Sequence, residues 1–456
     1  MYTNQNILNE EESAAEEGQK AIEAIYSDKV IPASLPVSCT SLPINIVGLV
    51  SFIAALYWLQ YLSLSSIAAT IIALLAFAVP ILILEVGSLK TYQRTSTGLD
   101  FTLQRSMNWQ RIAVKLLGIS FTLSFIGAIY WLIPEYHKTF YHPYWEMLGW
   151  TLPYALTVAA IYVFLVDRFQ KEPEDVYWQL GKLVLGRSSA LRRNDIYQHL
   201  LGWLVKGFFL PLMFVYTVHT VDYIRRTDFS IVLSSFQHTY EYLWQWIFLI
   251  DLTVATIGYV LTLRLLDNHI RSTDSTVGGW AVALICYEPF WTFVYGAYFS
   301  YNNDNFNWGN WLYNSPVLYV IWGSLILLSI TIYVLSHLTF GLRFSNLTHR
   351  GILTNGLYRF CKHPAYVSKN IAWWLVTVPF ISTQGWQDAV HNCLMLSVVN
   401  LIYFTRAKTE ERHLSRDPVY VQYALLMNNK SVFRVFSRII PYLRYRPPME
   451  MGTSIN

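Results

Sequence analysis

Residues 66–88 read SIAATIIALLAFAVPILILEVGS, a run that contains a single charged side chain, Glu85. A transmembrane helix needs about twenty consecutive and mostly apolar residues. The stretch is therefore predicted to cross a membrane. Because Glu85 lies near the end of the run, we expect its carboxylate to reach the polar interface.

The whole chain has the composition of an integral membrane protein. Of its 456 residues, 54% are hydrophobic and only 14% are charged, whereas an average soluble domain has roughly 25% charged residues. The 17 Trp and 32 Tyr residues suit the two membrane interfaces. A net charge of +4 is too small and too dispersed to indicate nucleic-acid binding.

The cysteines and histidines give no sign of a metal site, and none is predicted. The four cysteines are far apart and form no Cys-x-x-Cys pair, which argues against a zinc site and against a disulfide framework. They are Cys39, Cys286, Cys361 and Cys393.

Ten stretches are apolar and long enough to be candidate spans. The last two are short and are joined by residues 384–388, so they resemble a helical hairpin. The predicted spans are 44–62, 66–88, 112–133, 147–167, 199–221, 242–263, 278–299, 316–339, 371–384 and 388–404.

The distribution of basic residues supports this count. With both termini in the cytosol, 28 Lys and Arg residues fall in segments on the cytosolic side and 3 fall outside, as the positive-inside rule requires. Removing one span would place the basic C-terminal segment on the wrong side. The sequence thus predicts an all-α, multi-pass protein of about ten transmembrane helices with both termini cytosolic.

Three regions follow from this topology. Residues 1–42, acidic near their start, are predicted to form a cytosolic tail. Residues 43–240 would form accessory transmembrane helices, and residues 241–456 would form the core that carries the functional motifs.

The most informative polar stretch leads into the ninth predicted span. It reads NGLYRFCKHPAYVSKNIAWW over residues 355–374. Polar groups at a membrane boundary are costly and indicate function. Pro364 suits the first turn of a helix, and it restricts His363 to an extended conformation. A helix beginning there presents free N–H groups and a positive dipole end, which can hold a carboxylate or phosphate. Tyr366 and Asn370 are four residues apart and share a helix face.

A second polar segment follows the tenth predicted span. Arg406 and Glu410 are four residues apart and share a helix face, whereas Glu411 points elsewhere. Because a short hairpin joins the two segments, we expect them to lie close together around a cytosolic-facing pocket whose floor is in the bilayer. A carboxylate beside such a pocket can hold ribose hydroxyls or an amino group.

Together these segments resemble a known superfamily. The pattern N-G-x-Y-R-x-x-K-H-P-x-Y over 355–366 is similar to the signature of the isoprenylcysteine carboxyl methyltransferase and phospholipid methyltransferase superfamily. The pattern R-A-K-T-E-E-x-x-L over 406–414, followed by Tyr420 and Tyr423, resembles that superfamily's second signature. The resemblance covers about 340–425, under a fifth of the chain.

The resemblance implies an enzyme that transfers a methyl group from S-adenosylmethionine, bound on the cytosolic side, to a lipophilic substrate such as a prenylcysteine-type carboxylate or a lipid headgroup. It implies that Arg406 and Glu410 are catalytic, with Arg406 orienting the substrate. It implies a cofactor site formed by Gly356, Tyr358, Arg359, His363, Pro364, Tyr366, Asn370, Glu410 and Glu411.

This chain departs from the superfamily pattern at two positions and in length. Lys362 stands where Arg is usual, which keeps the charge but not the two-pronged geometry of a guanidinium. Ser368 replaces a frequent Gly. The first five predicted spans are additional to the superfamily core, so the substrate is less defined than the cofactor.

Two alternatives remain open at this point. Sterol reductases of ten spans are distantly similar in their C-terminal core and use NADPH, but their motifs differ from Ala365–Lys369 and Thr409–Glu411 of this chain. A non-catalytic lipid-binding membrane protein is the other alternative. A bacterial inner membrane and the endoplasmic reticulum are both compatible with the sequence.

Acidic residues inside predicted spans are candidate substrate contacts, because buried acids in a bilayer are costly. Asp251 and Glu288 lie at similar depth in the sixth and seventh spans. They could contact a substrate amine or hydroxyl, share a proton, or instead form structural pairs with Tyr or Trp donors on neighbouring helices. Pro289 should kink the seventh span. Trp374 is the third candidate for substrate contact.

Overall fold

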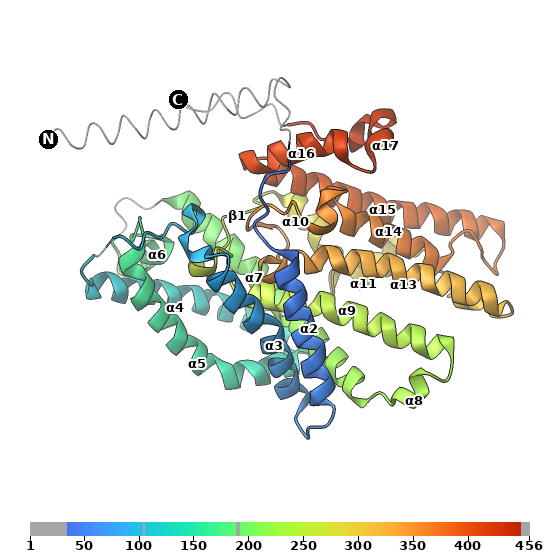
Figure 1. The fold of residues 1–456 in the computed structure, drawn as a ribbon, viewed down its shortest axis with the longest axis horizontal. Helices are drawn as coiled ribbons and strands as arrows, with labels where there is room; N and C mark the ends of the chain where they lie inside the picture. The colour runs from blue at the N-terminus through green and yellow to red at the C-terminus, as the bar shows by residue number, and fades with distance from the viewer. Residues whose placement is uncertain (1–33, 104, 188–191, 448–456) are drawn as a thin grey trace.

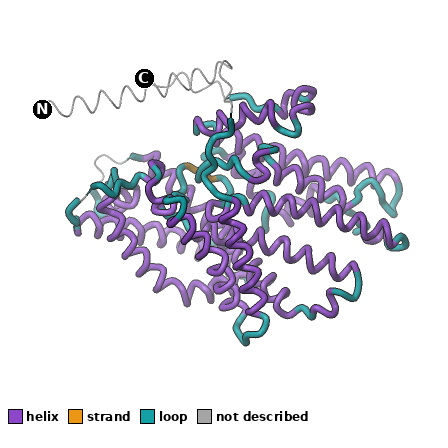
Figure 2. The backbone as a smooth tube through the Cα atoms, in the orientation of Figure 1, coloured by secondary structure: helices purple, strands orange, loops and turns teal. Residues whose placement is uncertain are grey.

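The computed structural model describes residues 34–103, 105–187 and 192–447. Helices dominate these residues, with loops and one short pair of strands between them (Figure 2). The predicted all-α class is confirmed. The predicted tail falls largely outside the described residues, which begin at residue 34.

The first half of the described chain holds mostly long helices, some of which contain proline, and the short helices α6 (Val176–Val184) and α8 (Phe229–Val232). The long helices are α2 (Leu42–Leu59), α3 (Ser66–Gly87), α4 (Trp109–Leu132), α5 (His142–Val166), α7 (Arg193–Arg226) and α9 (Phe236–Val260).

The second half holds further long helices, several short ones and the two strands. The elements are β1 (Ser272–Thr273), α10 (Val277–Leu284), α11 (Phe290–Val294), α12 (Trp308–Leu312), α13 (Pro316–Leu338), β2 (Thr348–His349), α14 (Pro364–Thr377), α15 (Trp386–Leu414), α16 (Pro418–Lys430) and α17 (Arg434–Ile439).

Seven helices of the described residues are long and apolar enough to cross a membrane. They are α2, α3, α4, α5, α7, α9 and α13, and each coincides with a predicted span. A multi-pass integral membrane protein is therefore supported. The count of ten spans and the cytosolic placement of both termini remain predictions.

The three other predicted spans take different forms. The stretch 278–299 is divided into α10, α11 and a π-helical turn at Tyr295–Phe299, and its break precedes Pro289. A proline lacks the N–H that would continue a helix. The stretch 371–384 lies partly in the 14-residue α14, and 388–404 lies within the 29-residue α15.

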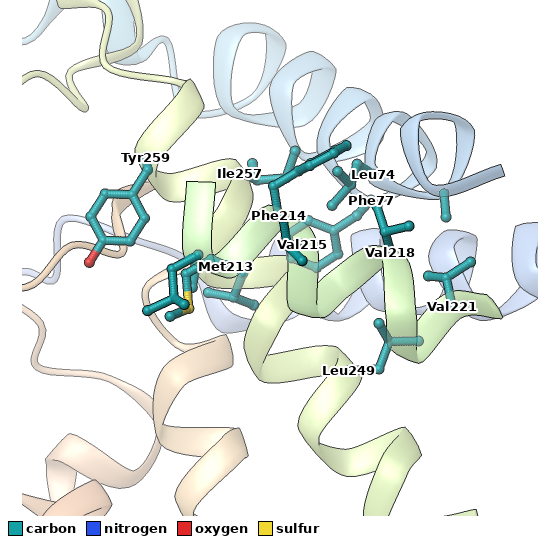
Figure 3. Packing of buried hydrophobic residues seen from close by; sticks show 14 of the residues in the cluster. Leu74, Phe77, Met213, Phe214, Val215, Val218, Val221, Leu249, Ile257 and Tyr259 are labelled. Carbon is teal, nitrogen blue, oxygen red and sulfur yellow. The ribbon is translucent and has the colours of Figure 1, made fainter. Parts of the chain in front are cut away.

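Helices α7, α9, α13, α14 and α15 pack in sequence, each against the next (Figure 1). Helices α2 and α3 pack together, and α3 contacts both α7 and α9. Buried side chains of α3, α7 and α9, including Phe77, Val218 and Ile257, form one continuous cluster (Figure 3). The helices on both sides of residue 240 therefore share a core.

Small residues allow the closest helix contacts. A Cβ atom at Gly118 of α4 would lie 1.9 Å from the carbonyl oxygen of Tyr177 in α6, and one at Gly181 of α6 would lie 1.9 Å from that of Val114. The absence of a side chain at both glycines lets the backbones of α4 and α6 approach this closely.

Glu85 does not reach the interface as predicted. Its side chain is fully buried, and its Oε1 lies 2.7 Å from Nη1 of Arg343, in the turn that follows α13. A buried charge requires a partner, and Arg343 supplies it. The pair joins α3 to the turn after α13, which precedes the first functional motif.

The segment 34–41 lies along residues 352–354, just before the first functional motif. The backbone N–H of Cys39 donates to the carbonyl of Ile352 at 3.0 Å, and the Thr354 hydroxyl donates to the carbonyl of Pro36 at 2.6 Å. Strands β1 and β2 pair antiparallel, with Ser272 opposite His349. Residues 34–41 and strand β1 therefore both support the loop at 348–354, although they are distant from it in sequence.

Candidate active site

The two sequence motifs meet directly, as the hairpin topology predicted. Helix α14 begins at Pro364, with His363 as its N-cap residue; its φ of −131° is as predicted, but its ψ of 59° falls short of a fully extended conformation. The Tyr366 hydroxyl hydrogen-bonds to Oε1 of Glu410, and Lys362 Nζ lies 2.6 Å from Oε1 of Glu411. Residues 44 and 49 positions apart in the chain thus form one constellation.

Glu411 holds this constellation together. Its side chain is 6% exposed, and it pairs with Lys362, with Lys408 at 2.6 Å and with Nε2 of His363 at 3.2 Å. Burial alone would raise the pKa of this carboxyl group. The hydrogen bond from His363 and the charges of Lys362 and Lys408 outweigh burial and hold its pKa well below the usual range.

A pocket with a cavity volume of about 120 Å³ opens beside this constellation. The walls are aromatic, with a few charged groups. They comprise Tyr287, Tyr333, His337, Phe340, Phe344, Ser345, Asn346, Gly351, Ile352, Leu353, Tyr358, Lys362, His363, Ala365, Tyr366, Lys369, Tyr403, Arg406, Glu410, Leu414, Tyr420 and Tyr423.

Arg406 contributes a buried cation to the pocket wall. It is 7% exposed and donates one hydrogen bond to Oδ1 of Asn346. Its guanidinium lies 5.5 Å from the ring centre of Tyr366 and 5.6 Å from that of Tyr287. Among the described residues, no carboxylate lies within 4.0 Å of it. The remaining N–H groups can therefore bind an anionic group in the pocket.

Glu410 faces the same space from one helical turn further along α15. Oε1 accepts from Tyr366, while Oε2 lies 4.0 Å from Nδ1 of His363. The side chain is 36% exposed. A cation and an acceptor carboxylate therefore face one pocket.

Five of the predicted site residues line the pocket, and five lie outside its lining. The lining residues are Tyr358, His363, Tyr366, Arg406 and Glu410. The predicted residues outside the lining are Gly356, Arg359, Pro364, Asn370 and Glu411.

Gly356 shapes the loop that precedes α14. Its φ of +55° lies in the left-handed region that favours glycine, and a Cβ atom there would lie 2.6 Å from the Thr339 hydroxyl oxygen. Arg359 is exposed. The side chain of Asn370 bonds to Asn400 at 3.2 Å. Gly356 and Asn370 therefore support segments beside the pocket without forming its wall.

The three candidate substrate contacts have separate environments. Asp251 pairs with His337, which lines the pocket. Glu288 accepts hydrogen bonds from Thr292 on its own helical segment and lies outside the lining. The indole N–H of Trp374 donates to Asn400 at 2.7 Å, also outside the lining.

Several lining residues escaped the sequence analysis, most notably His337, Asn346 and Lys369. Asn346 receives the hydrogen bond of Arg406 and donates to the hydroxyls of Tyr259 at 2.9 Å and Tyr287 at 3.1 Å. The sequence signal for His337 is only a histidine near the end of the eighth predicted span. Its partner Asp251 comes from another helix, α9, and so cannot be recognised from the local sequence.

A second pocket with a cavity volume of about 100 Å³ adjoins the first and shares Arg406 and Glu410 with it. Its other walls include Cys39 and His413. Burial lowers the pKa of His413 to about 4, so its imidazole is neutral near pH 7. The Arg406–Glu410 face of α15 therefore lines both pockets.

These features define the class: a multi-pass helical membrane protein with an aromatic, charged pocket formed by the segments that flank a helical hairpin. Residues 317–416 match the model of the isoprenylcysteine carboxyl methyltransferase family. The match runs from α13 to the end of α15, contains both motifs and confirms the resemblance predicted from them. It spans less than a quarter of the chain and indicates a membrane methyltransferase. No curated protein and no solved structure matches the chain.

Proposed function

We propose that the protein is a membrane-embedded methyltransferase that uses S-adenosylmethionine to methylate a lipophilic substrate. The observation that carries this proposal is the convergence of Tyr358, His363, Tyr366, Arg406 and Glu410 on one pocket, within or beside the segment that matches the methyltransferase family.

The charged and aromatic side chains of the pocket fit S-adenosylmethionine. Arg406 is a buried cation without a carboxylate partner among the described residues, and it suits a carboxylate of the ligand. Glu410 is an acceptor that suits an ammonium or ribose hydroxyl. The rings of Tyr287, Tyr366 and Tyr403 suit a cationic centre such as a sulfonium.

When bound, S-adenosylmethionine supplies an electrophilic methyl group together with its own leaving group. The task of this chain is therefore to align the acceptor with that methyl group and to exclude water. The ion pairs of Glu411 fix Lys362 and His363 relative to α15. They therefore hold the two motif segments in a constant position relative to each other. The rings of Phe340 and Phe344 provide an apolar wall for a lipophilic acceptor.

Calorimetric titration of the detergent-purified protein tests the cofactor. We expect micromolar binding of S-adenosylmethionine by the wild type and at least tenfold weaker binding by His363→Ala and His363→Gln. The matched control is His391→Ala, because His391 lies on α15 outside the pocket lining.

The alternatives predict other results. Binding of NADPH but not of S-adenosylmethionine would overturn the proposal in favour of a sterol-type reductase. Binding of neither compound by folded protein would overturn it in favour of a lipid-binding protein.

A further inference from the structure

A histidine and an aspartate from two neighbouring helices form a pair at the wall of the pocket. Nδ1 of His337, in the last turn of α13, hydrogen-bonds to Oδ1 of Asp251 in α9. The Tyr333 hydroxyl donates to the other oxygen of Asp251 at 2.9 Å. The side chains of His337 and Asp251 are only 13% and 15% exposed. Both carboxylate oxygens therefore have partners, and the orientation of the imidazole is fixed.

The second ring nitrogen of His337 has no hydrogen-bond partner among the described residues, and the residue lines the pocket. Because a carboxylate only accepts hydrogen bonds, it holds a proton on Nδ1, and in the neutral imidazole Nε2 then carries the lone pair. The aromatic rings of Phe344 and Tyr333 lie 4.8 Å and 4.4 Å from the imidazole and restrict its rotation. This is the arrangement by which a carboxylate prepares a histidine as a general base.

One further charged group approaches the pair. Lys369 of α14 also lines the pocket, and its ammonium lies 5.1 Å from the ring centre of Tyr333 and 5.3 Å from that of Tyr403. Lys369 forms no ion pair with Asp251 within 4.0 Å. The carboxylate of Asp251 therefore serves His337 rather than the lysine.

Resting on the proposed function, we propose that His337 is the general base for the methyl acceptor and that Asp251 is its positioning residue. A carboxylate acceptor would need no base, because it is already a nucleophile at neutral pH. A base facing the pocket points to an acceptor that must lose a proton: a lipophilic molecule with a hydroxyl or amino group. Arg406 then holds the carboxylate of the cofactor rather than that of the acceptor.

The O–H or N–H bond of the acceptor breaks, and its proton moves to Nε2 of His337. The electron pair left on oxygen or nitrogen forms the bond to the methyl carbon, while the pair of the former carbon–sulfur bond stays on the departing neutral thioether. Asp251 stabilises the imidazolium, which then releases its proton to water.

The first test measures the tautomer of His337 by ¹⁵N NMR on histidine-labelled protein in micelles. The signal is assigned by its loss in His337→Gln. We expect a protonated Nδ1 and an unprotonated Nε2, a state that Asp251→Asn should change. A proton on Nε2 in the wild type would overturn the proposal.

The second test identifies the bond that forms. Membranes that contain the overexpressed protein are incubated with methyl-tritiated S-adenosylmethionine, and their lipids are treated with mild base. Methyl esters release volatile label, whereas methyl ethers and methylamines do not. We expect base-stable label that falls at least 100-fold in His337→Gln and is unchanged in His391→Gln.

Three results would overturn the assignment. The first is base-labile label, and the second is base-stable label that does not fall in His337→Gln. The third is a lack of base-stable label although the protein binds the cofactor. Calorimetry separates this failure from failure of the proposed function. If only the acceptor assignment is wrong, wild type and His337→Gln still bind S-adenosylmethionine with similar affinity. If the proposed function is wrong, the wild type does not bind it.

Discussion

The ammonium of Lys362 lies 2.6 Å from the carboxylate of Glu411, and this contact joins the two motif segments of the pocket. Lys362 occupies the position where the superfamily pattern has Arg, so a single-pronged cation makes the connection here. Because Lys408 and His363 contact the same carboxylate, Glu411 is the centre of the cluster. The cluster predicts that Glu411 determines the stability of the pocket rather than contacting a ligand.

Glu411→Gln should therefore destabilise the protein. The change leaves Lys362, whose side chain is 10% exposed, without a counter-charge, and breaking a buried ion pair costs about 3–5 kcal/mol. We expect the apparent melting temperature in detergent to fall by several degrees. Glu172→Gln is the matched control, because that side chain is 79% exposed. Equal melting temperatures for wild type and Glu411→Gln would contradict this role.

The same carboxyl group predicts the acid sensitivity of the protein. A group whose pKa is lower in the folded state adds stability above its unfolded pKa, about 4.3 for Glu, and loses that stability as the pH falls toward the folded value. The difference in melting temperature between wild type and Glu411→Gln should stay constant from about pH 7 to 5 and shrink below about pH 4. A difference that grows on acidification would refute the assignment.

Seven helices could be predicted because each is a long apolar run, and the meeting of the two motifs could be predicted because a hairpin joins them. The buried pair of Glu85 and Arg343 could not, since 258 residues separate the partners and hydropathy carries no pairing information. The break before Pro289 was foreseen only as a kink. The pairing of His337 with Asp251 depends on how α9 and α13 rotate against each other, which sequence alone leaves open.

Arg406→Lys should weaken binding of the product S-adenosylhomocysteine at least tenfold. Lysine keeps the charge but loses the planar fork that donates to Asn346 and that, under the proposed function, would also bind a ligand carboxylate. Calorimetry on purified protein measures the change. Arg412→Lys is the control, because Arg412 is exposed on the same helix and bonds to Thr276 outside the first pocket. A dissociation constant within twofold of the wild type would show that Arg406 does not hold the ligand.

Gly356→Ala should lower stability by about 1–2 kcal/mol from its left-handed backbone alone, and by more because the added Cβ atom would collide with Thr339 at 2.6 Å. Gly127→Ala provides the control, since nothing lies within 4 Å of a Cβ atom at that position in α4. We expect a lower melting temperature for the first variant and an unchanged or slightly higher one for the second. Because Gly356 lies outside the pocket lining, the folded fraction of Gly356→Ala should bind S-adenosylmethionine with wild-type affinity. Wild-type stability combined with lost binding would instead place Gly356 in contact with the cofactor.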